Sequence, residues 1–77
     1  MLNELRAIAG CDRGWAAQRA EMAVAITEQF QGGGLDAGEY QELMADLVRT
    51  DRLDAEADDL ELKTALVTAI YAVAQLR

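Results

Sequence analysis

Apolar residues recur at intervals of three and four along most of the chain, which is the spacing of one face of an α-helix. The pattern predicts a short helix over residues 2–9, a second from Asp12 to Gln31, a third after Asp36, and a fourth that continues to Leu76. No proline interrupts these segments, and alanine, leucine and glutamate, which favour helix, are plentiful. We therefore expect a single all-α domain over residues 1–77, folded as a small three- to four-helix bundle.

The second predicted helix, with Asp12 as its N-cap, carries large apolar side chains on one face. The residues expected to be buried on that face are Trp15, Met22, Ala23, Ile26 and Phe30. Asn3 is the expected N-cap of the shorter helix before it, which stops at Gly10. Because glycines lie at both Gly10 and Gly14, the two segments could also form one helix with a flaw between them.

The third predicted helix has the best-defined beginning in the sequence. Asp36 and Glu39 have the spacing of a capping box, and Leu35 and Tyr40 have that of a hydrophobic staple. The side chains expected on its buried stripe are Tyr40, Leu43, Met44, Leu47 and Val48. The second and third helices should therefore form a hairpin over Asp12–Arg49 that packs on the apolar C-terminal helix.

Three consecutive glycines, Gly32 to Gly34, separate the second and third helices. A phosphate-binding loop would need a lysine and a hydroxyl residue after the last glycine, whereas Leu35 and Asp36 follow, and an acid there repels phosphate. The expected structure is a turn in which glycine supplies a left-handed backbone conformation. The alternative is a hinge that lets the second helix swing or exchange between subunits.

The fourth predicted helix begins at Asp54 as its N-cap and is the most apolar part of the chain. Ten of the twelve residues from Ala65 to Leu76 are apolar, which is too short a run to span a bilayer but more than two neighbouring helices readily cover. The helix is therefore either the central rod of the domain or part of an interface. We expect the core set to be Leu62, Leu66, Ile70 and Val73, and the interface with a second copy to be Val67, Tyr71 and Ala74.

The charge of the chain restricts its partners. Fourteen acidic residues against seven basic ones give a net charge of −7, so we expect no direct binding to nucleic acid or to an anionic membrane. The first residues lack the apolar stretch of a signal peptide, which favours a cytoplasmic location. A possible acidic contact surface comprises Asp51, Asp54, Glu56, Asp58, Asp59 and Glu61. Three of these acids alternate as in a calcium-binding loop, but the loop's glycine and distal glutamate are missing.

Reactive groups are scarce. The chain contains no histidine and no serine, so no Ser–His or Cys–His pair can form. Cys11, the single cysteine, is expected to pack rather than to react, and Trp15 is expected in the core rather than at a binding hot spot. We therefore expect no enzymatic activity, no cofactor and no metal site.

One segment, Gly33–Leu47, resembles the short helical SHOCT-like module, in which a glycine, an aliphatic residue and a capping residue precede Glu-Tyr and a leucine stripe. The matching positions are Gly34, Leu35, Asp36, Glu39, Tyr40, Leu43 and Leu47. The resemblance covers about a fifth of the chain and implies an oligomerising or protein-binding helix. In size, acidity and helical layout the chain is also similar to small accessory proteins of tailed bacteriophages.

These expectations together favour an interaction protein. The first hypothesis is a non-enzymatic acidic helical module, a homodimer of the phage-accessory type that binds and modulates another protein. The second is a structural assembly or scaffolding factor whose helices tile into larger oligomers. The third is an acidic nucleic-acid mimic that blocks a DNA-binding protein through its late acidic residues.

Overall fold

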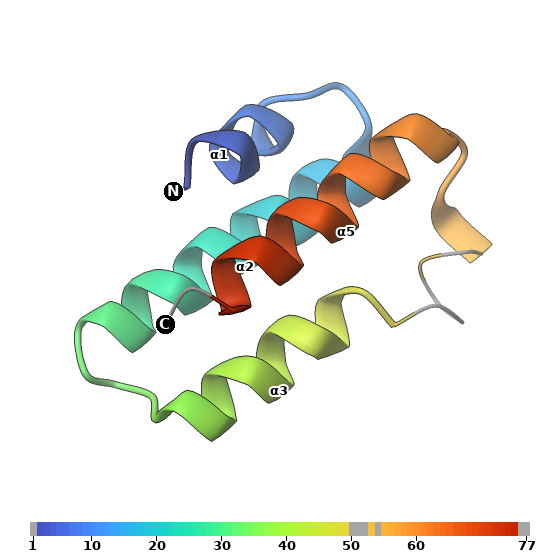
Figure 1. Cartoon of the computed structure of the whole chain (residues 1–77). Helices are drawn as coiled ribbons and strands as arrows, with labels where there is room; N and C mark the ends of the chain where they lie inside the picture. The colour runs from blue at the N-terminus through green and yellow to red at the C-terminus, as the bar shows by residue number, and fades with distance from the viewer. Residues whose placement is uncertain (1, 50–52, 54, 76–77) are drawn as a thin grey trace.

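The computed structural model describes residues 2–49, 53 and 55–75, and these residues contain helices and no strand. The principal helices are α1 (Asn3–Ala9), α2 (Gly14–Gln31), α3 (Ala37–Leu47) and α5 (Leu60–Gln75). The expected all-α bundle is therefore confirmed (Figure 1).

The helices pack around α2 and α5. α2 and α3 form an antiparallel hairpin, and α5 lies across α2 between α1 and α3 (Figure 1). α5 contacts α1, α2 and α3, so three helices rather than two cover it. The fully buried large side chains at the centre come from different parts of the chain, and they include Leu5, Tyr40, Met44, Leu53, Leu66 and Ile70.

The first two helices are separate, and neither predicted N-cap is present. Asn3 lies inside α1, which is preceded by Leu2, and α2 is preceded by an extended Arg13 that makes no side-chain cap. Asp12 lies one residue too early to bond the first turn of a helix that starts at Gly14. The link between the helices is instead held by backbone bonds, such as the one from the Cys11 N–H to the Ile8 carbonyl, 3.0 Å.

The buried face of α2 agrees with the predicted one at Ala23 and differs elsewhere. The residues that α2 buries are Ala16, Ala20, Ala23 and Thr27. Of the large apolar residues expected there, Trp15, Ile26 and Phe30 are only half-buried, and Met22 is 52% exposed. Both stripes have helical spacing and lie side by side, so periodicity alone could not choose between them. Alanines let neighbouring helices approach closely, and the larger side chains then lie along the edge of the contact.

The glycine run forms the expected turn. The Gly34 N–H donates to the Gln29 carbonyl (2.9 Å) and the Gly33 N–H donates to that of Phe30 (3.1 Å), a pair of bonds that defines a Schellman motif. Gly33 has φ of +85°, a left-handed conformation that side chains disfavour. The turn ends α2 and reverses the chain into α3.

The capping box of α3 is present as predicted. Oδ1 of Asp36 accepts from the Glu39 N–H at 2.8 Å, and the Glu39 carboxylate accepts from the Asp36 N–H at 3.1 Å. The predicted stripe is buried at Tyr40, Met44 and Val48, whereas Leu47 is half-buried and Leu43 is 38% exposed. α3 therefore presents a partly apolar edge to solvent beside α2.

Removal of the Asp36 cap should destabilise the domain measurably. Asp36→Ala leaves first-turn N–H groups without an acceptor and should lower the free energy of unfolding by about 1 kcal/mol. Chemical denaturation followed by circular dichroism measures the change. Glu42→Ala, on the same helix but outside the capping box, is the control and should shift the midpoint little; equal shifts would contradict the assignment.

The predicted fourth helix is divided in two. Leu53, Ala55 and Glu56 are helical, residues 57–59 are not, and α5 begins only at Leu60. Oδ1 of Asp59 accepts from the Leu62 N–H at 3.1 Å, so Asp59 acts as the N-cap of α5. The predicted cap, Asp54, lies outside the described residues.

Candidate interaction surfaces

The groups that could carry chemistry are dispersed. Cys11 lies half-buried between α1 and α2, packs against the core and directs its Sγ toward the Arg13 carbonyl at 3.6 Å. Among the described residues, no group of three or more acidic, cysteine or histidine side chains is placed to hold a metal ion.

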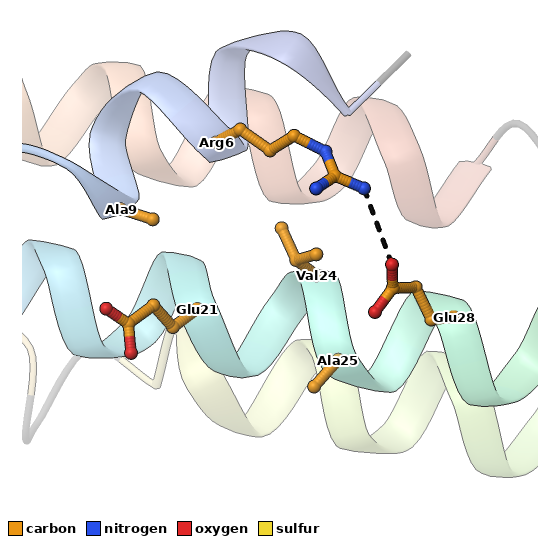
Figure 2. A pocket seen from close by; sticks show the side chains of 6 residues that line it. All are labelled: Arg6, Ala9, Glu21, Val24, Ala25 and Glu28. Carbon is orange, nitrogen blue, oxygen red and sulfur yellow. Dashed lines mark hydrogen bonds and ion pairs between the residues drawn. The ribbon is translucent and has the colours of Figure 1, made fainter.

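An open hollow of about 320 Å³ lies between α1 and α2 (Figure 2). Arg6 of α1 reaches across it to Glu28 of α2, with 3.4 Å between Nη2 and Oε2, and Val24 points into the space between the helices. Glu21 lies two helical turns before Glu28, so the two carboxylates are separated by about 10 Å along the axis and do not converge on one point. The hollow is a surface feature spanned by an exposed ion pair.

The late acidic residues are largely engaged within the chain. Glu56 pairs with Arg19 at 2.6 Å, and Asp58 pairs with Arg13 at 2.9 Å. Asp58 also accepts from the Trp15 indole N–H at 2.9 Å. Asp59 caps α5, Glu61 is exposed in its first turn, and Asp51 and Asp54 lie outside the described residues. These contacts hold the segment before α5 on α2. The side chains of Glu56 and Asp58 stay more than half exposed, so the acidic contact surface remains a prediction.

Arg19 makes several of the contacts between α2, α3 and the segment before α5, and this role was not predicted from the sequence. Its Nε donates to the Leu47 carbonyl at 3.0 Å and its Nη1 donates to the Trp15 carbonyl at 3.1 Å, in addition to the pair with Glu56. The side chain is only 15% exposed. One available signal was its position four residues after Trp15 and three before Met22, on the same face as the large apolar residues.

The hydrogen bond from Trp15 lowers the pKa of the Asp58 carboxyl. The indole N–H that donates to Oδ1 holds the pKa of the Asp58 carboxyl below its ordinary value of 3.8, and the positive charge of Arg13 acts in the same direction. Partial loss of hydration opposes both effects without outweighing them. Trp15 is thus half-buried at the core's edge, with its polar atom on the acidic segment.

The contribution of Asp58 to stability should depend on pH in a defined direction. Because its folded pKa is lowered, the contribution is complete above the unfolded pKa near 3.8 and is lost as the pH falls through the folded value. Trp15→Phe removes the donor and should raise the Asp58 pKa, as measured by an NMR titration of the carboxyl carbon. Arg49→Gln, which breaks the separate pair with Asp46, is the control. Superimposable Asp58 titrations in the unmodified and Trp15→Phe proteins would contradict the assignment.

α5 divides its apolar residues differently from the expected pattern. Leu66, Ile70 and Val73 of the expected core set are buried and Leu62 is half-buried. Of the expected interface residues, Tyr71 is 48% exposed, Val67 is half-buried against the core, and Ala74 is 8% exposed and belongs to the core. The core is wider than predicted because α1 as well as α2 and α3 packs on α5.

The exposed side of α5 follows a different line from the predicted interface. Leu60, Thr64, Thr68 and Tyr71 are exposed at intervals of four, four and three, so they form one row, here named the α5 stripe. Leu60 is 76% exposed. From Thr64 to Ala74 the sequence contains no acidic or basic residue, whereas the exposed sides of the other helices carry acids such as Glu4, Glu28 and Glu42.

Comparisons with known proteins identify no relative. No family model matches the chain, and neither curated proteins nor solved structures give a significant match. The resemblance of Gly33–Leu47 to the SHOCT-like module therefore stays a prediction. Within residues 2–49, 53 and 55–75, no helix has the length and hydrophobicity needed to cross a membrane.

Proposed function

We propose that this chain is a non-enzymatic, acidic protein-interaction module that pairs with a second copy of itself through the α5 stripe. The observation that carries the proposal is an exposed helix face without charge on a chain whose net charge is −7. The interface includes Tyr71, and the stripe rather than Val67 and Ala74 supplies its other residues.

Electrostatics favours this face for self-association. Two copies that each carry −7 repel one another, and a contact that buries an unpaired carboxylate costs additional free energy. The α5 stripe avoids both problems over most of its length, because Thr68, Tyr71 and their neighbours bring no charge into the contact, while the exposed Glu61 lies near its N-terminal end. Burial of Leu60 and Tyr71 contributes about 25 cal/mol for each Å² of apolar surface removed from water.

A two-fold arrangement is the simplest that uses one face twice. A standard stable interface buries about 1,600 Å² in total. A single helix of 16 residues offers a smaller area, so the dimer should exchange with monomer at micromolar concentrations. A two-fold contact uses the same face of both copies and leaves no such face free for a third. This arrangement therefore favours a dimer over the extended scaffold of the second hypothesis. The in-chain pairing of Glu56 and Asp58 supports it over a nucleic-acid mimic.

Tyr71→Glu tests the proposed interface. The substitution places a carboxylate at the C-terminal end of the stripe on both copies, and it should weaken association at least tenfold while the half-exposed site keeps the monomer folded. Sedimentation velocity over a concentration series measures association, and circular dichroism verifies the fold. Ala45→Glu adds the same charge to an exposed site on α3 and should leave association nearly unchanged. Equal association by all three proteins would refute the interface.

A further inference from the structure

A second exposed apolar surface lies on the hairpin of α2 and α3, and acidic residues border it. Met22 is 52% exposed on α2 and Leu43 is 38% exposed on α3, and each is followed one turn later by a half-buried apolar residue, Ile26 and Leu47 respectively. Met22 and Leu47 also line a hollow of about 320 Å³ between the two helices. These four residues are here named the α2–α3 groove; Met22 and Leu47 reach the hollow, and Ile26 and Leu43 continue the two apolar rows one turn further along their helices.

The groove is the consequence of how α2 packs. Because α2 directs Ala16, Ala20 and Ala23 at the core, its larger side chains lie to either side of this contact. Met22 and Phe30 lie on the side toward α3. The end of the hollow is fixed by Arg19, whose guanidinium is already held by the Leu47 carbonyl and by Glu56. The hollow is thus mixed in character: Gln18, Asp46 and Glu56 line it together with Met22, Leu47 and the braced Arg19.

The two rims of the groove differ in charge. On α3, Glu39, Glu42 and Asp46 are exposed at intervals of three and four and flank Leu43. On α2, the exposed residues one turn to either side of Met22 and Ile26 are glutamines, Gln18 and Gln29. The acidic rim extends over eight residues, a rise of about 10 Å or two turns of helix. A ligand that fits has an apolar ridge and positive charge along one edge.

We propose that the α2–α3 groove binds a basic amphipathic helix of a partner protein. Apolar residues of the partner at intervals of three and four pack on Met22 and Leu43. Its lysine or arginine side chains along one edge pair with Glu42 and compete with Arg49 for Asp46. A second copy of this chain fits poorly, because α5 offers no basic edge to the acidic rim and its other helices would bring carboxylates against it. The surface is separate from the α5 stripe, so this proposal does not rest on self-association.

Two synthetic helical peptides provide the probe. Both carry leucine at the same intervals of three and four, and one has lysine at the remaining positions where the other has glutamate. Titration into the labelled protein, followed by amide chemical shifts, should show the basic peptide binding with a Kd of about 10–100 μM and shifts concentrated on the groove. The acidic peptide should not bind. Absence of basic-peptide binding at about 1 mM, or equal binding of both peptides, would overturn the proposal.

Matched variants separate groove binding from general attraction to an acidic protein. Met22→Gln combined with Leu43→Gln removes the two exposed apolar side chains of the groove and should weaken binding about tenfold. Glu42→Lys reverses a charge on the rim and should weaken binding severalfold more than Glu21→Lys, which makes the same change on the side of α2 that faces α1. Equal effects of the two reversals would reduce the interaction to nonspecific charge attraction and overturn the proposal.

A last comparison distinguishes this proposal from the proposed dimer. Peptide binding should be the same in the Tyr71→Glu protein as in the unmodified one, because the α5 stripe is not part of the groove. If Met22→Gln with Leu43→Gln abolished self-association instead, a second copy would occupy the groove, and the assignment to a basic partner helix would be wrong.

Discussion

Leu66→Glu should abolish the cooperative unfolding transition of the domain. Leu66 has no exposed surface and lies on the side of α5 that contacts the other helices. A carboxylate there loses its hydration without gaining a partner, and burial of an unpaired charge costs several kcal/mol. For a chain of this size that cost approaches the whole free energy of unfolding, which is only about 5–15 kcal/mol for native proteins in general.

Ala65→Glu is the matched control for this prediction. The residue precedes Leu66 on the same helix but is exposed, so its charge stays hydrated and the helical circular dichroism should persist. Thermal scans of both variants and the unmodified protein measure the difference. A cooperative transition in Leu66→Glu at an unchanged midpoint would show that α5 is packed by another face.

The buried hydroxyl pair between α2 and α3 should show strong coupling. Thr27 is 1% exposed and Tyr40 is fully buried, and their hydroxyl oxygens lie 2.8 Å apart. Either single substitution, Thr27→Val or Tyr40→Phe, leaves the other hydroxyl buried without a partner and should cost about 1–3 kcal/mol. The double variant removes both polar groups and should lose no more than the larger single effect.

A double-mutant cycle by chemical denaturation measures this coupling. Phe30 stacks on the Tyr40 ring, with 4.4 Å between centroids and 5° between planes, and Tyr40→Phe retains that contact. The loss in Tyr40→Phe therefore reports on the hydroxyl group alone. Simple addition of the two single effects would contradict a direct bond between Thr27 and Tyr40.

Local signals in the sequence were sufficient for parts of the fold. The capping box at Asp36 and the turn at Gly33 each depend on a few neighbouring residues, so spacing and residue type predicted them directly. The buried stripe of α2 depends on the approach of other helices. The sequence favoured its larger residues, but the alanines allow the closer contact and are the ones buried.

The candidate surfaces were less predictable because they depend on contacts distant in sequence. Asp58 lies 43 residues from Trp15, and no spacing rule connects them. A continuous helix from Asp54 was predicted, whereas residues 57–59 are not helical. The Asp59 cap and the bonds of Asp58 stabilise this break. The sequence predicted an outward position for Tyr71, which is 48% exposed, but Ala74 is in the core because α1 as well as α2 and α3 packs on α5.

Sedimentation equilibrium of the unmodified protein tests the central claim most directly. If the α5 stripe pairs two copies, the average mass should rise from 8.4 kDa at low concentration toward twice that value at about 100 μM. The rise should persist in moderate salt, because the interface contains no ion pair and screening reduces the repulsion between the acidic copies. A mass of 8.4 kDa throughout the series would contradict the proposal, and the α5 stripe would then be the solvent-facing side of a monomeric bundle.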